Sequence, residues 1–170
     1  MNTHRWRRAI APLLLILFVI IGGCAANQPS RFDQAQQEST GSKATPAVAK
    51  DATQGASFNK FFPQPGNGFT RVYTQEKKGF SEAKLNKGDK TLALLSINDT
   101  SSNPEAAAKF KQSTKKIAGY PSVLQGSTAT ALLVADRYQV KVMSKDAAFT
   151  ETDRETWLGK FNLTGLSQVK

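Results

Sequence analysis

The chain has 170 residues, of which 23 are Lys or Arg and 13 are Asp or Glu, and its net charge is +10. Its one cysteine is Cys24 and its one histidine is His4, so no thiol or imidazole follows position 24. The rest of the chain therefore cannot form a disulfide, a Ser-His-Asp or Cys-His catalytic site, or a zinc site built on His or Cys. Neither a P-loop nor a G-x-G-x-x-G pattern is present.

The N-terminal segment has the organisation of an export signal. Three arginines precede position 9 without any acidic residue, and residues 9–21 are apolar apart from Pro12. A basic start, a short apolar run and small residues before a cleavage point are typical of a secretory signal. The apolar run is shorter than the roughly 20 residues that a membrane-spanning helix needs, and Pro12 does not suit such a helix. We therefore predict a signal peptide at residues 1–23.

The end of this signal carries a more specific motif. Ile21, Gly22, Gly23 and Cys24 follow one another, and this order resembles the lipobox of bacterial lipoprotein precursors. The resemblance implies that the Cys24 thiol becomes a diacylglyceryl thioether and that cleavage before Cys24 releases the signal. It also implies a membrane location, with the protein lipid-anchored on the exported (periplasmic or lumenal) side. The alternatives are an ordinary secretory signal with an incidental cysteine and an uncleaved anchor.

The segment at 24–56 is predicted to be the lipidated N-terminus and a flexible linker. It consists mostly of Gln, Ser, Thr, Ala, Lys and Gly, and its only large apolar side chains are Phe32 and Val48. Such a segment buries too little apolar surface to offset the entropy of ordering it. It is either a flexible tether that lets the domain reach partners near its membrane or a linker without a specific role. The folded domain is predicted at 57–170.

Strands dominate the first half of this domain. Phe58 and Phe62 share one face of a short helix, and a Pro-Gly-Asn-Gly turn at 65–68 follows it. The β-branched and aromatic residues at 69–75 predict a strand, and residues 80–85 predict a second one. A hairpin turn at 86–89 leads into residues 90–98, whose nearly continuous apolar run predicts a central strand covered on both faces.

A helix is predicted to begin at Asn103, Pro104 and Glu105, which are a capping residue, a first-turn proline and a first-turn acid. Its apolar stripe runs through Ala106, Phe110, Ser113 and Ile117, and residues 119–121 end it. Four lysines lie mostly off this stripe. They are interpreted either as the solvated face of the helix or as a docking surface: Lys109, Lys111, Lys115 and Lys116.

The C-terminal part predicts more strands and a helix. Residues 122–126 are expected to form an edge strand, and 128–135 and 137–143 two long strands. Thr150 and Asp153 have the spacing of a capping box, and Thr152 with Glu155 offers a second register. The one acidic cluster, Glu151, Asp153 and Glu155, is therefore interpreted as the start of a helix rather than as a metal or catalytic site. Trp157, Leu158 and Phe161 are predicted on its buried side, and Leu163 and Leu166 close the core.

This element order predicts an α+β fold, with an antiparallel sheet covered by two or three helices. Gly119-Tyr120-Pro121, LVADRYQVKV at 133–142 and DRETWL at 153–158 resemble segments of small cyanobacterial lipoproteins whose role is unassigned. The element order also resembles that of the PsbP-like photosystem-associated proteins. Neither resemblance supplies a catalytic residue, and none is carried over.

Three functional hypotheses remain. The first is a non-enzymatic lipoprotein that binds or stabilises a membrane-associated protein complex, without a cofactor or metal and without contact to nucleic acid. Without the residues before Cys24 the charge is +7, which favours anionic partners. The second is a carrier of a lipid or pigment, with a pocket lined by Tyr120, Tyr138 and Trp157. The third is a hydrolase that uses Glu151, Asp153 and Glu155. The oligomeric state stays open.

Overall fold

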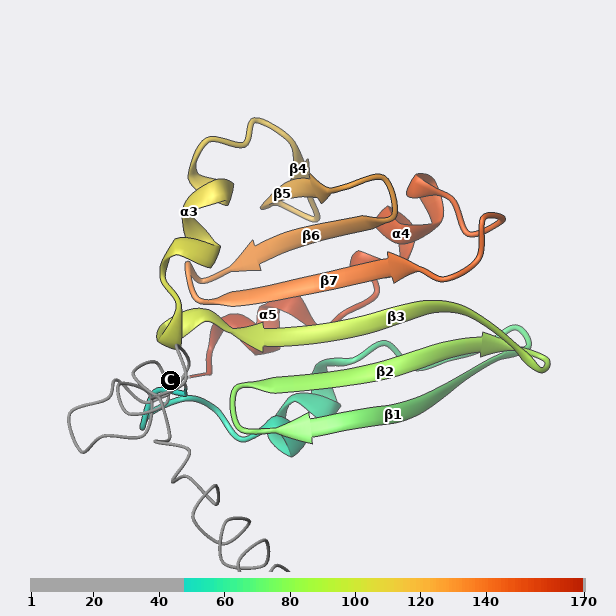
Figure 1. Cartoon of the computed structure of the whole chain (residues 1–170), viewed down its shortest axis with the longest axis horizontal. Coiled ribbons are helices and arrows are strands. Elements are labelled where there is room, and N and C mark those ends of the chain that lie inside the picture. The colour runs from blue at the N-terminus through green and yellow to red at the C-terminus, as the bar shows by residue number, and fades with distance from the viewer. Residues whose placement is uncertain (1–47, 170) are drawn as a thin grey trace, which may run out of the picture. The chain divides into compact units, whose positions relative to one another are not determined.

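The computed structural model describes residues 48–169, which form one folded unit. Its centre is a seven-stranded sheet in the order β1-β2-β3-β7-β6-β5-β4, with every pair antiparallel (Figure 1). Two meanders build it. The first contains β1 (Phe69–Lys77), β2 (Phe80–Lys87) and β3 (Lys90–Asp99), and the second contains β4 (Lys116–Ile117), β5 (Tyr120–Gln125), β6 (Ala129–Val134) and β7 (Tyr138–Ser144). The expected α+β class with an antiparallel sheet is confirmed.

Strands β3 and β7 join the two meanders at the middle of the sheet. Leu95 pairs with Val142 and Ile97 pairs with Val140, and all four side chains are buried. The central position expected for residues 90–98 is therefore correct. The expected cover on both faces is wrong, because Leu94 and Asn98, on the side opposite the main core, are only partly buried. Strand β5 was expected at an edge, but the two-residue β4 lies outside it.

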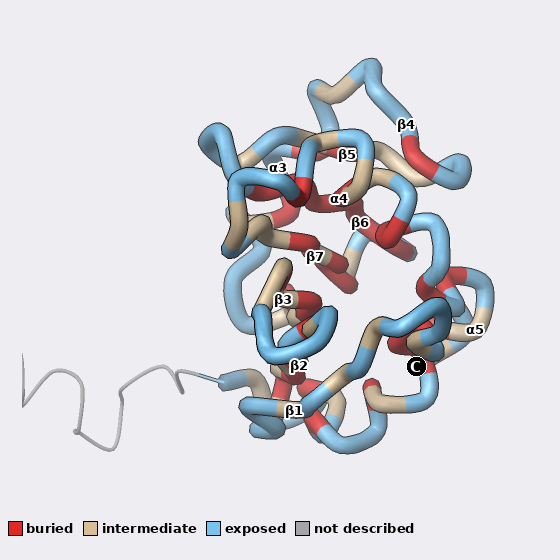
Figure 2. The backbone as a smooth tube through the Cα atoms, turned by 90° about the vertical axis from the view of Figure 1, so that its right-hand side faces the viewer, coloured by how far each residue is buried: buried red, intermediate tan, exposed pale blue. Residues whose placement is uncertain are grey.

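The main hydrophobic core lies on one face of the sheet, beneath three short helices. These are the 3-10 helix η1 (Gly55–Phe61) and the α-helices α4 (Glu151–Leu158) and α5 (Leu163–Ser167). Figure 1 shows α4 and α5 behind the sheet, and in Figure 2 the buried backbone follows the strands and these helices. As predicted, Trp157, Leu158, Phe161, Leu163 and Leu166 are buried there. Figure 2 also shows that long exposed segments surround this core.

A smaller core occupies part of the opposite face. Helix α3 (Glu105–Lys111) packs on β5 and β6 through Ala107 and Phe110, which contact Ala131 and Leu133. In β6 these two residues alternate with Leu132 and Val134, which belong to the main core. Strand β6 is therefore buried on both faces, whereas α3 is too short to cover the whole second face.

The helix predicted from Asn103 to Ile117 is wrong in its second half. Helix α3 ends at Lys111, and Ile117 lies in β4, where it contributes to the main core. The Ser113 hydroxyl donates to the Ser122 carbonyl, and the Lys115 amide donates to the Ser113 hydroxyl. A serine that bonds nearby backbone competes with helix continuation, and here it turns the chain back towards β5. The spacing of Phe110, Ser113 and Ile117 thus matched a helix only by coincidence.

The folded unit also begins before position 57. Ala52 and Gly55 are buried, and the Gly79 amide donates to the Thr53 carbonyl over 2.7 Å. A Cβ atom at Gly55 would collide with the backbone oxygens of Lys77 and Phe80, so this position requires glycine. Residues 48–56, predicted as the end of a linker, therefore pack against the sheet. The signal peptide, Cys24 and the rest of the predicted linker lie outside the described residues.

The predicted capping box at the start of α4 is confirmed. The Thr150 hydroxyl accepts from the Asp153 amide over 3.3 Å, and the Asp153 carboxylate accepts from the Thr150 amide over 2.7 Å. We expect Thr150→Ala to lower the free energy of unfolding by about 1 kcal/mol, because it leaves a helix-start amide without its acceptor. Urea denaturation of the purified chain measures this loss. Thr152→Ala, in the register that the structure does not use, is the matched control, and an equal loss in both variants would contradict the assignment.

Candidate functional site

The second face of the sheet is left partly uncovered, and we call this region the open face. It comprises β1, β2, β3 and β7 on the side opposite the main core, whereas α3 packs on the neighbouring β5 and β6. The strand register orders its side chains in three rows across these four strands. The rows are Val72, Lys84, Leu94 and Met143; then Gln75, Glu82, Ser96 and Lys141; then Lys77, Phe80, Asn98 and Gln139. Ser96 and Gln139 are buried, and the other ten are partly or fully exposed.

Lysines give the open face its charge. Lys77, Lys84 and Lys141 lie on it, and Glu82 is the acid among the three rows. Lys109 of α3 adds a further cation beside Lys141. Burial lowers the pKa of Lys109, and the neighbouring charge of Lys141 lowers it further. A lysine whose pKa is lowered by another lysine sits in a positive potential, and such a potential attracts an anionic partner.

Apolar side chains lie between these lysines. Val72 is 51% exposed although it stands within a strand, next to Lys84 across the ladder. Leu94, Met143 and Phe80 are partly exposed, and the Lys77 ammonium lies 5.4 Å from the centre of the Phe80 ring. Apolar side chains bordered by charged ones are the usual composition of a protein-binding surface.

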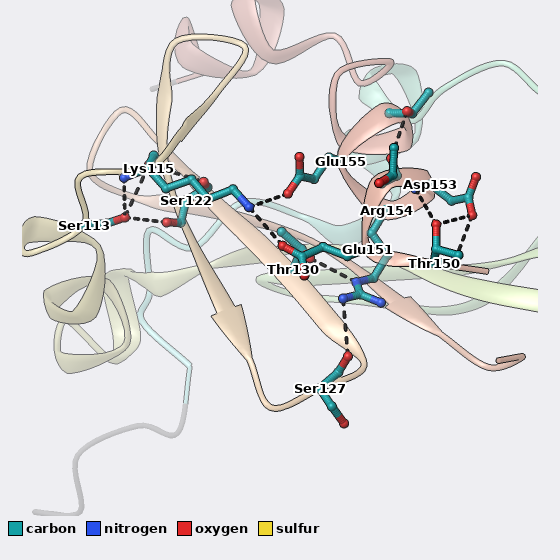
Figure 3. A network of polar contacts seen from close by, with 12 residues as sticks. Ser113, Lys115, Ser122, Ser127, Thr130, Thr150, Glu151, Asp153, Arg154 and Glu155 are labelled. Carbon is teal, nitrogen blue, oxygen red and sulfur yellow. Dashed lines mark hydrogen bonds and ion pairs between the residues drawn. The ribbon is translucent and has the colours of Figure 1, made fainter. Parts of the chain in front are cut away.

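The four lysines proposed for docking do not share one surface. Lys115 and Lys116 lie beyond the end of α3, Lys115 directly before β4 and Lys116 within it. The Lys115 ammonium pairs with both Glu151 and Glu155 of α4 (Figure 3). Lys111 is exposed at the end of α3 and faces a cleft near Arg137. Of the four, only Lys109 is shown to adjoin the open face.

The pocket expected at Tyr120, Tyr138 and Trp157 is not formed by these residues. Tyr138 is fully buried, with its ring edge-on to Phe58 at 5.9 Å, and Trp157 is buried against Phe69 at 5.1 Å. Tyr120 is partly exposed and packs on the same core. None of the three lines the clefts described in this structure. Their large side chains fill the main core between the sheet and the helices, so they are packing residues.

The acidic cluster has two structural roles. Asp153 caps α4, and the hydrogen bonds from the Thr150 hydroxyl and amide lower its pKa. Glu151 and Glu155 bind Lys115, whose hydrogen bond lowers the pKa of Glu151. Within residues 48–169, no group of three or more His, Cys, Asp or Glu side chains is placed to hold a metal ion. The hydrolase hypothesis stays a prediction, and in this structure its three carboxylates cap α4 or bind Lys115.

The sequence contained a usable signal for the open face. In 137–143, Arg137, Gln139 and Lys141 alternate with the buried Tyr138, Val140 and Val142. In β1, the same alternation places Val72 on one face of the strand and its neighbours Arg71 and Tyr73 on the other. What the alternation cannot show is that α3 stops over β6. Only the tertiary structure shows which strands stay uncovered.

No family model, curated protein or solved structure matches this chain. The predicted likeness to cyanobacterial lipoproteins and to the PsbP-like proteins therefore stays a prediction. No helix in the described part of the chain is long and apolar enough to cross a membrane. The lipobox residues Ile21, Gly22, Gly23 and Cys24 precede the described residues, so their processing also stays a prediction.

Proposed function

We propose that this protein is a membrane-anchored lipoprotein whose basic α+β domain acts, without catalysis, as a binding or stabilising factor for a membrane-associated protein complex. The observation that carries the proposal is the open face, where Val72 is 51% exposed beside Lys84 and the lysines outnumber Glu82. Such a surface fits an acidic protein, since opposite potentials speed encounter and select the partner, while the apolar side chains hold the contact.

The predicted lipid anchor supports the same function. A diacylglyceryl group at Cys24 would hold the domain at one membrane, because two acyl chains bind stably where one does so only marginally. Tethering raises the effective concentration of the open face near proteins of that membrane. A modest affinity at the open face then suffices for stable association.

The test compares four forms of the full chain, expressed with an affinity tag in the cells that make it and purified in mild detergent at low ionic strength. They are the wild type, Cys24→Ser, Lys84→Glu with Lys141→Glu, and the control Lys60→Glu with Lys160→Glu. The two control lysines are exposed, and they lie on η1 and after α4, on the helix-covered side. Both double variants change the net charge equally.

We expect a defined membrane complex to co-purify with the wild type and with the control. Reversing Lys84 and Lys141 should reduce its recovery about tenfold, since each exposed contact is worth up to about 1 kcal/mol and reversal adds repulsion. Raising the salt concentration should reproduce this loss in the wild type. Cys24→Ser should lose the complex through loss of the anchor. If both double variants recovered the complex equally, the open face would not be the binding surface.

The lipid or pigment carrier is a weaker alternative. The residues assigned to its pocket, Tyr138 and Trp157, pack within the core, and Tyr138 bonds Thr53 and Val169 rather than facing a cleft. No other observation in the described part of the chain favours a large apolar ligand.

A further inference from the structure

Arg154 is a buried cation that forms no ion pair with a carboxylate of the described residues. Its side chain projects from α4 towards the start of β6, and the residue is 4% exposed (Figure 3). Its Nε donates to the Thr130 hydroxyl over 3.0 Å, Nη1 to the Ser144 hydroxyl over 2.9 Å and Nη2 to the Ser127 carbonyl over 3.3 Å. All three acceptors are neutral. No carboxylate among residues 48–169 lies within 4.0 Å of this guanidinium.

This arrangement is unusual for a buried charge. A guanidinium stays protonated and carries five N–H donors, of which the three hydrogen bonds use only three. Buried arginines are normally paired with an anion, because removing a charge from water costs several kcal/mol that neutral acceptors offset only in part. Arg137 differs from Arg154 in this respect: its side chain is 24% exposed, and it forms a two-pronged ion pair with the buried Asp99.

The Arg154 side chain lines an open cleft of about 410 Å³ between α4, the β5–β6 turn and the loop after β7. Hydroxyl groups and one further cation surround it. They belong to Ser127, Thr128, Ser144, Thr150 and Lys145. A cleft of this size accommodates a small organic molecule. Arginine, lysine and Ser or Thr hydroxyls are also the side chains that usually contact phosphate oxygens.

The two acids at the cleft are paired with lysines other than Lys145. Asp146 binds Lys90, whose hydrogen bond lowers the pKa of Asp146. Glu151 binds Lys115, whose hydrogen bond is the main cause of its lowered pKa, and the charge of Arg154 lowers that pKa slightly further. Both carboxylates are therefore ionised, and each already forms an ion pair with a lysine. Arg154 and Lys145 remain as the cations that can serve a ligand. We call this group of residues the Arg154 cleft.

We infer that the Arg154 cleft is a binding site for a small phosphate-bearing anion, with the Arg154 guanidinium as its central contact and Lys145 at its rim. The bound phosphate would take the place of the missing counter-ion, and the neighbouring hydroxyls would complete its hydrogen bonds. The site is on the opposite side of β6 from α3 and uses none of the open-face residues, so it is independent of the proposed function. Two sources share this chemistry: a free phosphate ester and the headgroup of an anionic lipid.

The test uses the ¹⁵N-labelled full chain in a mild non-ionic detergent, titrated with inorganic phosphate and with glycerol 3-phosphate while NMR amide shifts are followed. We expect saturable shifts confined to residues 127–130 and 144–154, with glycerol 3-phosphate binding at least as tightly as phosphate. Equal titration with sodium chloride provides the ionic-strength control. No saturable shifts, or small shifts spread over all the exposed lysines, would overturn the inference.

Two variants identify the contacts. Arg154→Gln should weaken phosphate binding at least tenfold, and Lys145→Gln about threefold, because a central buried contact is worth more than an exposed one. Lys145 is exposed, so its variant keeps the fold even if Arg154→Gln does not. Lys160→Gln, at the other end of α4, is the matched control and should bind as the wild type does. Unchanged affinity in Lys145→Gln would remove Lys145 from the site, and unchanged affinity in a folded Arg154→Gln would place binding elsewhere.

The two sources are separated with vesicles of phosphatidylcholine with or without phosphatidylglycerol. If the ligand is a lipid headgroup, the Cys24→Ser chain should bind the anionic vesicles, and free glycerol 3-phosphate should compete with them. If the ligand is a free phosphate ester, it should shift the same amides while vesicle binding stays independent of Arg154. Both outcomes support the anion site and differ only in where its ligand comes from.

Discussion

Replacing Tyr138 by alanine is expected to lower the free energy of unfolding by about 3–5 kcal/mol. The side chain is fully buried in β7, at the centre of the sheet, with its ring edge-on to Phe58. Its hydroxyl lies 3.2 Å from the Thr53 hydroxyl and donates to the Val169 carbonyl over 3.4 Å. Truncation removes the ring from the core and leaves a cavity that neighbouring strands cannot close. Since domains are typically stable by 5–15 kcal/mol, the variant should be only marginally folded.

Urea denaturation followed by tryptophan fluorescence measures this loss. Tyr120→Ala is the control, because Tyr120 is partly exposed on β5, beyond β6 in the sheet, and its replacement should cost much less. A small loss at Tyr138, similar to that at Tyr120, would contradict the packing role and revive the ligand-pocket interpretation. A ligand-lining aromatic residue leaves no cavity in the core when it is removed, so stability separates the two roles.

The second large effect is expected at Asp99, whose replacement by asparagine should lower the free energy of unfolding by about 2–4 kcal/mol. The carboxylate is fully buried and accepts from Arg137 Nε over 3.0 Å and Nη2 over 2.8 Å. It also accepts from the amides of Thr53 and Ser101. Arg137 in turn donates to the Asp51 carbonyl, so this group fastens residues 48–54 to the sheet. The upper part of the range applies if Arg137 cannot rotate into water.

The same contacts predict how stability depends on pH. Burial raises the pKa of Asp99, but the hydrogen bonds from Arg137, Thr53 and Ser101 outweigh it and hold this pKa well below its ordinary value. The carboxylate is therefore more acidic in the folded than in the unfolded chain. Its stabilising contribution is complete above the unfolded pKa of about 4 and is lost as the pH falls towards the folded value.

Denaturation curves from pH 3 to pH 7 test this dependence. The wild type should lose stability below about pH 4, and Asp99→Asn should show a shallower loss because its side chain does not titrate. Asp146, Glu151 and Asp153 also have lowered pKa values, so part of the slope will remain in the variant. Asp89→Asn, at an exposed hairpin turn, is the control. Limited proteolysis near residue 51 should speed up only in Asp99→Asn; equal cleavage in both variants would contradict the fastening role.

The two proposed surfaces lie on different sides of the sheet and have different chemistry. The open face combines lysines with partly exposed apolar side chains, which suits a protein partner. The Arg154 cleft combines a buried guanidinium with hydroxyls, which suits a small anion. Failure of the charge-reversal experiment would leave the phosphate titration unaffected. Failure of the phosphate titration would likewise leave the charge-reversal experiment unaffected, because no residue belongs to both surfaces.

Local sequence patterns determined most elements of this fold. Alternation of apolar and polar residues predicted β7 with its buried face, and the Thr150 and Asp153 spacing predicted the start of α4. These features depend on interactions between residues within one turn or one strand of each other. A short stretch of sequence is therefore enough to predict them. The lipobox-like order of residues 21–24 can also be read from adjacent residues, and its function stays a prediction.

Contacts between distant residues decided the rest. Helix α3 ends at Lys111 because Ser113 bonds Ser122 of β5, and residues 48–54 are held by Asp99 and Arg137. The open face exists because α3 stops over β6, and the Arg154 cleft exists because α4 places a guanidinium beside Ser127, Thr130 and Ser144. The periodicity of an element tells which of its faces is buried. It does not tell what lies opposite that face, because that depends on how the elements pack together.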